Sequence, residues 1–201
     1  MTTSPQTSPT DRAGNAGSWT RFQALLAPLH DQAAATARHL SGSVADGDDL
    51  FQETVLRAYL KLPSLRDEAN FRSWFFALLL NAHRNHVRRG FWRRFLSLER
   101  DLAPGFDPAG EDGCARERER QQAERATRVL AGLPAVQREA VVLFEIEGFS
   151  VEEVAAMQKA SVSAVKSRLA RGRERLRRAY ERLGVAPRSR PAGFRKLEEI
   201  P

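Results

Sequence analysis

The sequence contains little cysteine and no long apolar run. Its 201 residues include 1 cysteine, Cys114, so a framework of intrachain disulfides is excluded. No apolar run approaches the roughly 20 residues of a membrane span. The first residues, MTTSPQTSPTDRAGNAG, lack the hydrophobic core of a signal peptide. These absences predict a soluble protein that acts in the cytoplasm.

The sequence also lacks the motifs of common catalytic and metal sites. It has no Gly-rich phosphate loop and no nucleophile motif. His83 and His86 are three residues apart on a predicted helix, but no acidic or cysteine partner completes a ligand set. We therefore expect no enzymatic activity, no metal and no cofactor.

Positive charge is what the sequence has in excess. The 32 Lys and Arg residues outnumber the 25 Asp and Glu residues, and the formal net charge is +7. This balance favours a polyanionic partner. Composition alone would also fit a ribosomal or membrane-surface protein.

Apolar residues recur at helical spacing, and there is no strand pattern of substance. Pro28 predicts either a kink in the first helical segment or a later start of the helix, and Gly42 ends the segment. The stretch after Ser97 is rich in proline and glycine and has no sustained periodicity, as is typical of a linker. The predicted helices span residues 19–42, 46–61, 71–89, 116–131, 135–147, 150–157 and 161–178.

The last two predicted helices form the most informative stretch. Ser150 and Glu153 have the spacing of a capping box, and Ser161 stands where the second helix would have its N-cap. An apolar stripe follows one face of the second helix, formed by Val162, Val165, Leu169 and Leu176. Its other faces are rich in arginine. Two helices joined by a short turn, the second one basic, indicate a helix-turn-helix that binds DNA, with an ordinary solvated basic helix as the simpler alternative.

The pattern as a whole predicts an all-α protein of two small helical domains joined by a flexible linker, the C-terminal one a helix-turn-helix. We expect a disordered tail at 1–17, a helical domain at 18–95, a linker at 96–115, the helix-turn-helix domain at 116–183 and a C-terminal tail at 184–201. The two domains would have separate tasks. A single packed body with the arginine-rich helix buried would contradict this division.

Two blocks of the sequence resemble the conserved regions of bacterial sigma factors of the extracytoplasmic-function (ECF) group, the smallest members of the sigma-70 family. They are DGDDLFQETVLRAYLKLPSLRDEANFRSWFFALLLNAHRNHVRR, residues 46–89, and LPAVQREAVVLFEIEGFSVEEVAAMQKASVSAVKSRLARGRERLRR, residues 133–178. The resemblance implies an alternative sigma factor that binds RNA polymerase core and directs promoter-specific transcription initiation. Promoter DNA, the clamp and flap of the polymerase and an anti-sigma factor would be its partners.

The resemblance also implies roles for individual residues. The first block would contact the polymerase clamp through Asp49, Gln52, Glu53 and Arg57. The loop and helix that follow would recognise and melt the −10 element through Ser64, Leu65, Arg66, Asn70, Phe71 and Asn81. The helix-turn-helix would read the −35 element through Ser163, Lys166, Ser167, Arg168 and Arg171.

Several positions depart from the family pattern. Lys159 occupies the turn of the helix-turn-helix, where glycine is frequent, so it must adopt a left-handed conformation or change the turn. Gly172 replaces a typical alanine, at a cost of about 1 kcal/mol in helix propensity. Ala77 and Leu80 stand where basic residues are common.

Two rival functions explain less of the chain. A stand-alone helix-turn-helix regulator that binds duplex DNA without polymerase accounts for residues 133–178 but gives residues 46–89 no task. An adaptor that binds RNA or ribosomes through its basic surface leaves the capped helix pair unexplained.

Overall fold

The structure, a computed structural model, describes residues 9–96 and 125–182. Every regular element in these two ranges is helical, as the sequence predicts. The predicted linker, apart from Leu96, and the predicted C-terminal tail at 184–201 lie outside the described residues. The predicted helix at 116–131 can be followed only from residue 125, and residues 125–131 are helical.

The first half of the chain is a bundle of four helices. They are α1 (Pro9–Leu26), α2 (His30–Ser41), α3 (Val44–Lys61) and α4 (Phe71–Leu96), with 3₁₀ turns at Ala27–Leu29, Leu62–Ser64 and Glu68–Asn70. Pro28 lies in the turn between α1 and α2, which confirms the predicted kink. Gly42 follows α2 in the left-handed conformation, with φ of 81°, as expected of a helix-ending glycine.

Three boundaries in this half differ from the prediction. Helix α1 begins at Pro9, so residues 9–17, which we expected to belong to a disordered tail, are helical. Proline is compatible with a first helical position because its missing N–H would have no partner there. Helix α3 begins at Val44, since Ser43 caps it by accepting a hydrogen bond from the Asp46 N–H at 3.1 Å. Helix α4 continues through Gly90 to Leu96.

The second half contains α6 (Ala135–Val141), a π-helical turn (Val142–Ile146), α7 (Val151–Gln158) and α8 (Val162–Arg182). The predicted helix at 135–147 is therefore present, but its second part is wider than an α-helix. Because the hydrogen-bond spacing changes inside one apolar run, the pattern of the sequence does not reveal such a turn.

The caps of the helix-turn-helix are those predicted. The Ser150 hydroxyl accepts from the Glu153 N–H at 3.1 Å, and the Ser150 N–H donates to the Glu153 carboxylate at 2.7 Å. The Ser161 hydroxyl accepts from the Ala164 N–H at 3.2 Å. Between the helices, Lys159 adopts φ 50° and ψ 49°, so the turn keeps its left-handed residue although that residue is not glycine.

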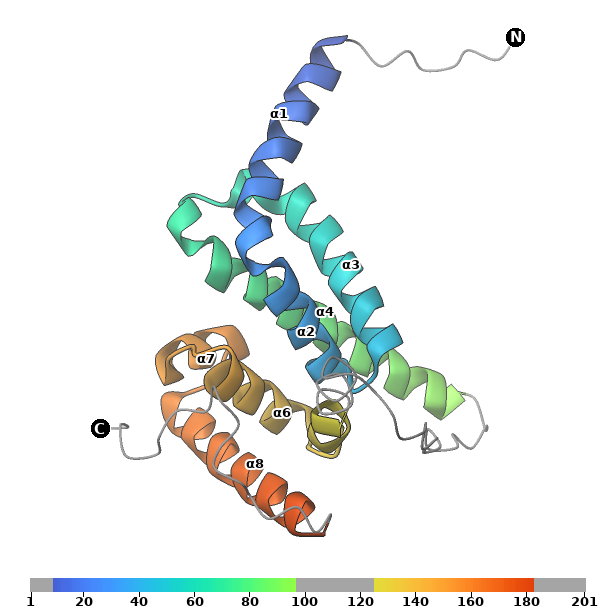
Figure 1. The fold of residues 1–201 in the computed structure, drawn as a ribbon, viewed down its shortest axis with the longest axis vertical. Coiled ribbons are helices and arrows are strands. Elements are labelled where there is room, and N and C mark those ends of the chain that lie inside the picture. The colour runs from blue at the N-terminus through green and yellow to red at the C-terminus, as the bar shows by residue number, and fades with distance from the viewer. Residues whose placement is uncertain (1–8, 97–124, 183–201) are drawn as a thin grey trace, which may run out of the picture.

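The two helical domains on either side of the linker pack against each other, a contact that the sequence did not predict. Figure 1 shows α6 and α7 lying against the bundle of α2 and α4, with α8 on the far side. The rings of Phe76 in α4 and Phe149 before α7 are 5.2 Å apart, and their side chains belong to one buried cluster. Hydrophobic periodicity did not reveal this contact because several of the residues buried in it are polar. The arginine-rich helix is nevertheless not buried, since many of its cationic side chains remain exposed.

Candidate nucleic-acid and polymerase interfaces

One face of α8 anchors it to the rest of the helix-turn-helix. Val165, Leu169 and Leu176 are buried, as predicted, whereas Val162 is 36% exposed, so the apolar stripe begins one turn later than expected. These residues fix which side of α8 faces solvent. The outward side is therefore the one available to a DNA groove.

Gly172 has a packing role that the sequence did not reveal. A Cβ added at this buried glycine would lie 2.7 Å from Cγ2 of Val141 in α6. Real Cβ atoms do not approach other carbons so closely, so the missing side chain allows α8 and α6 to touch. The sequence shows only the expected loss of helix propensity.

Four of the five residues predicted to read the −35 element lie on the exposed side of α8. Ser163, Lys166, Ser167 and Arg171 are exposed, and all fall within three turns of the start of the helix. Arg168 is half-buried, and its guanidinium donates to Oε1 of Gln158 at 2.7 Å. The structure thus brings the predicted set together, with Arg168 held against α7.

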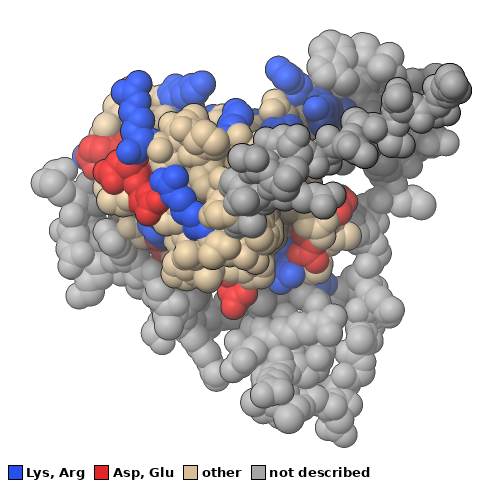
Figure 2. All heavy atoms as spheres, turned by 90° about the horizontal axis from the view of Figure 1, so that it is seen from above, with Lys and Arg blue, Asp and Glu red and all other residues tan. Residues whose placement is uncertain are grey.

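The far end of α8 carries cations whose charge is largely matched by carboxylates. Arg173 donates to Glu145 at 2.6 Å, and both Arg177 and Arg178 bond to Glu174. The hydrogen bonds from Arg177 and Arg178 lower the pKa of the Glu174 carboxyl to about 2. Figure 2, which views the molecule from the opposite end to α8, also shows acidic side chains beside basic ones. The positive charge is therefore distributed unevenly over the surface of the described residues.

The predicted −10 residues lie in and after the loop between α3 and α4. Ser64, Arg66, Asn70 and Asn81 are exposed, and Leu65 is half-buried. Asp67 shapes the loop, since its carboxylate accepts from the Ala69 N–H and from the Asn70 side-chain amide, both at 3.0 Å. Phe71 is only 2% exposed and packs between Phe22 and Phe75. Its side chain can therefore position the loop but is not accessible to a base, and Asn81 lies about 15 Å farther along α4.

The predicted clamp residues share the outer side of α3. Asp49 and Gln52 are exposed, whereas Glu53 and Arg57 are half-buried. Glu53 forms an ion pair with Arg57 and also contacts His86 of α4. Two of the four residues are thus accessible as they stand, and two are already engaged with each other.

Sequence reasoning missed two exposed apolar residues on this same helix. Leu56 is 65% exposed and Leu60 is 76% exposed. A signal was available, because Leu50, Thr54 and Ala58 form the buried face and helical spacing puts residues 56 and 60 opposite them.

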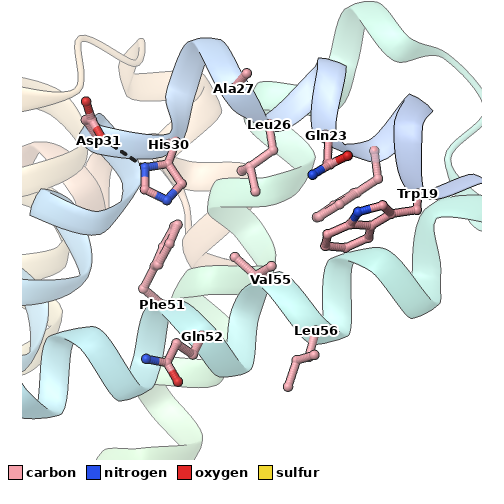
Figure 3. A pocket seen from close by; sticks show the side chains of 11 residues that line it. Trp19, Gln23, Leu26, Ala27, His30, Asp31, Phe51, Gln52, Val55 and Leu56 are labelled. Atoms are coloured by element: carbon pink, nitrogen blue, oxygen red, sulfur yellow. Dashed lines mark hydrogen bonds and ion pairs between the residues drawn. The ribbon is translucent and has the colours of Figure 1, made fainter.

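An apolar groove of about 720 Å³ lies beside these residues, between α1 and α3. Figure 3 shows Trp19 and Leu26 from one side and Phe51 and Val55 from the other converging on it, while Leu56 stands at its edge. His30, at one end, lies edge-on to the Phe51 ring, with centroids 5.1 Å apart. The groove adds an apolar surface beside the predicted clamp residues.

Two buried carboxylates lie where the halves of the chain meet. Burial by itself raises the pKa of Glu139, but hydrogen bonds from His83 and Arg84 and the charge of Arg84 outweigh it, so the pKa lies below its ordinary value. Glu147 shows the opposite balance. Burial raises its pKa, and the Thr36 hydrogen bond and the charge of Arg72 offset only part of the shift.

Residues 9–96 and 125–182 contain neither a helix suited to span a membrane nor a cluster of metal ligands. None of the helices there is both long enough and apolar enough to cross a membrane. Over the same residues, no group of three or more His, Cys, Asp or Glu side chains is arranged to hold a metal ion.

Comparisons with known proteins agree with this arrangement. A family model described as sigma-70 region 2 matches residues 25–93, and one described as sigma-70 region 4 matches residues 123–176. The chain is 33% identical over 172 residues to the ECF RNA polymerase sigma factor SigM of Mycobacterium tuberculosis H37Rv, covering 85% of this chain and 83% of that protein. It is 31% identical over 156 residues to the ECF sigma-E factor of Salmonella typhimurium LT2, covering 72% and 78%.

Solved structures are similar as well. The sigma factor RpoE of Bartonella quintana, in complex with the anti-sigma factor NepR, matches with a TM-score of 0.62 and 26% identity, covering 80% of this chain and 97% of that chain. CnrH, in complex with the cytosolic domain of CnrY, matches with a TM-score of 0.60 and 27% identity, covering 85% and 94%.

A two-domain all-helical chain that pairs a region 2 bundle with a region 4 helix-turn-helix is a sigma-70 family protein. Within that family, the chain belongs to the ECF sigma factors. It directs promoter-specific transcription initiation through regions 2 and 4, as a non-catalytic subunit of RNA polymerase.

Proposed function

We propose that this sigma factor divides promoter recognition and polymerase binding among three surfaces. The exposed side of α8 reads the −35 element, the loop between α3 and α4 recognises and melts the −10 element, and the outer side of α3 binds the clamp of the polymerase. This places its action in the cytoplasm. The observation that carries the proposal is the exposure of Ser163, Lys166, Ser167 and Arg171 on one side of a helix whose opposite side is anchored.

The −35 assignment follows from the shape and chemistry of α8. A helix enters the major groove of B-DNA, where arginine and lysine can bond guanine edges and the flanking phosphates. Arg171 supports this role because it is exposed and has no hydrogen bond or ion pair within the described part of the chain. Arg168 is instead oriented by Gln158, which would reduce the entropy lost when it meets a base.

The −10 assignment rests on the loop. Extruding a base costs a few kcal/mol of stacking energy, so the protein must offer a preformed set of partners. Asp67 holds the loop in a defined shape, and Ser64, Arg66 and Asn70 are left exposed on it. Phe71 supports the loop from the core.

The clamp assignment combines polar and apolar groups. Asp49 and Gln52 provide charge and hydrogen bonds, and Leu56 and Leu60 provide apolar area that water covers in the free chain. Such a mixture, an apolar centre with a polar rim, is typical of protein interfaces. The groove beside α3 belongs to the same surface.

We also propose that an anti-sigma factor holds this chain inactive. The similar RpoE was solved in complex with the anti-sigma factor NepR. A cognate anti-sigma factor would reduce run-off transcription when added to the chain before core polymerase. A protein that binds the chain without this effect would be a different kind of partner.

The function is tested by run-off transcription with purified core polymerase on a pool of genomic promoters, followed by sequencing of the products. We expect transcripts that start downstream of a shared pair of −35 and −10 elements only when the chain is present. Specific footprints of the chain on duplex DNA without polymerase would instead favour a stand-alone regulator.

A further inference from the structure

We propose that Arg21 of α1 is a positioning residue for the −10 loop, although it lies outside every surface assigned above. It holds the turn at Glu68–Asn70 in place through Glu68, so that the loop already has its shape when a base of the melted strand arrives. This role rests on the −10 assignment and adds a residue to it. Two neighbouring residues of α1 carry the proposal, because they contact the two ends of one short segment.

The turn before α4 needs an anchor because none of its residues is buried. Residues 66–70 are all exposed, and burial resumes at Phe71. Asp67 fixes the shape of the turn from within, since its carboxylate accepts from the Ala69 N–H at 3.0 Å and its carbonyl oxygen accepts from the Asn70 N–H at 3.2 Å. These bonds lie inside the turn, so they do not determine where the turn lies relative to the bundle.

Two consecutive residues of α1 connect the turn to the bundle. Nε of Arg21 donates to the carboxylate of Glu68, the first residue of the turn, at 2.5 Å. The ring of Phe22 lies edge-on to the ring of Phe71, which directly follows the turn, with centroids 6.1 Å apart. Figure 1 shows α1 beside the loop between α3 and α4. One helix therefore holds both ends of the segment 68–71.

Helix α1 is itself firmly placed at this point, so the Arg21 side chain starts from a fixed backbone. Phe22 is fully buried, and its ring packs edge-on against that of Tyr59 in α3, with centroids 5.7 Å apart. Trp19 packs against the same tyrosine at 5.2 Å. A side chain on a packed helix positions its partner more precisely than one on a loop.

The ion pair also changes the charge that the loop presents to DNA. A single strand carries a negative charge at each phosphate, and the turn presents the carboxylates of Asp67 and Glu68 beside the cation of Arg66. Arg21 brings a matching positive charge to Glu68. The two side chains of the pair are 52% and 48% exposed, and exposed pairs add little to stability because water screens them. The pair therefore serves to place the loop and contributes little to folding.

Charge-neutral double variants separate the ion pair from net charge. Arg21→Gln with Glu68→Gln removes the pair, and Arg21→Glu with Glu68→Arg reverses it. The control is Arg38→Gln with Asp48→Asn, which removes an ion pair of similar exposure, 43% and 41%, that joins α2 to α3 at 2.8 Å. The net charge of the chain is the same in all three. We expect each to unfold at nearly the temperature of the parent chain.

Amide hydrogen exchange of the free chain is the first measurement. The N–H groups of Ala69 and Asn70 are protected by Asp67 when the turn is in place. Removal of the pair should make these groups exchange about three- to tenfold faster, because the turn opens locally more often. The reversed pair and the control should exchange at nearly the parent rate.

The affinity of the holoenzyme for a labelled single strand is the second measurement. The probe is the non-template −10 strand of a promoter that run-off transcription identifies, compared with a scrambled strand of the same composition. Removal of the pair should weaken binding of the −10 strand about three- to tenfold, because the loop must then be ordered during binding. Binding of the scrambled strand should not change, since the net charge is constant. The reversed pair should restore the preference for the −10 strand.

Several results would overturn the proposal. A chain without the pair that matches the parent in either measurement would do so, as would an equal loss of affinity for both strands. So would a reversed pair that behaves like the removed one, or a control that loses as much as the test variant. A parent holoenzyme with no preference for the −10 strand would instead reject the −10 assignment, while the exchange rates of the free chain still decide whether Arg21 holds the loop.

Discussion

Gly172 of α8 and Val141 of α6 approach so closely that no side chain fits between them. A Cβ at residue 172 would be 2.7 Å from Cγ2 of Val141, and Val141 is itself fully buried. The valine methyl cannot move away easily, because a β-branched side chain has one strongly preferred rotamer in a helix. The contact fixes how α8 sits on α6 in region 4.

Gly172→Ala should therefore destabilise the protein although alanine is the better helix former. The gain in helix propensity is about 1 kcal/mol, whereas overpacking a buried contact costs about 1–3 kcal/mol. We expect a net loss of about 1 kcal/mol in the free energy of unfolding, measured by denaturant titration. Gly17→Ala is the control, because a Cβ at Gly17 in α1 meets nothing within 4 Å. A stabilised Gly172→Ala variant would show that α8 can shift without cost.

Lys159 offers the opposite case, a position where glycine should be better. Its φ of 50° is unfavourable for a residue with a Cβ, and its side chain is exposed. Lys159→Gly should stabilise the chain by about 0.5–1 kcal/mol, while Lys159→Ala keeps the Cβ and should bring no such gain. The unfolding temperatures of both variants test this prediction. Equal increases would mean that the loss of the lysine charge, and not the backbone conformation, causes the change.

The buried carboxyl of Glu147 makes a prediction about pH. Because its pKa is raised in the folded chain, the charged form opposes folding. This penalty is complete above the raised pKa and is relieved as the pH falls towards the ordinary value of about 4.3. Glu147→Gln should therefore raise the unfolding temperature at pH 7 and above, and its advantage should shrink as the medium becomes acidic.

The exposed Glu152 on α7 gives the control for this series. Glu152→Gln should leave the pH dependence of unfolding nearly unchanged. A Glu147→Gln variant that is less stable than the parent chain at pH 7 would mean that the attraction of Arg72 and the hydrogen bond of Thr36 outweigh the cost of burial.

Local features of both halves were predictable because they depend on neighbouring residues. The capping box at Ser150, the cap at Ser161 and the turn at Pro28 each follow from a few positions in sequence, and the structure confirms all three. The burial of Val165 and Leu169 was equally predictable, since helical spacing identifies both positions.

Contacts between distant parts of the chain were not predictable in the same way. Glu139, Glu147 and Thr36 are polar residues that periodicity assigns to a surface, yet all are buried where the halves meet. Their partners in the other half of the chain are 55 to 111 residues away in sequence. The packing role of Gly172 was missed for the same reason, because it depends on a close approach to Val141 and not on a local property of α8.

Asp49 and Glu53 should respond differently to charge reversal, although both are assigned to the polymerase clamp. Asp49 is exposed, so Asp49→Lys should weaken core binding at least several-fold with little change in stability. Glu53 also pairs with Arg57 and contacts His86, so Glu53→Lys should lower the unfolding temperature as well. Core affinity by fluorescence titration and thermal unfolding separate the two effects. Undiminished core affinity of Asp49→Lys would remove that residue from the clamp surface.

Arg171 should act through the DNA backbone or a base edge in the −35 element, whereas Arg177 should not. Arg171 is exposed and free of ion pairs within the described residues, but Arg177 bonds to both Glu174 and Glu181. If Arg171 contacts a phosphate, Arg171→Ala should lower the slope of log affinity against log salt by about 1 for holoenzyme on a −35-dependent promoter. If it contacts a base, the loss should be about 1–3 kcal/mol and should disappear on a promoter with that base pair changed. Arg177→Ala is the matched control on the same helix, and an equal loss from both variants would reduce the role of Arg171 to that of general positive charge.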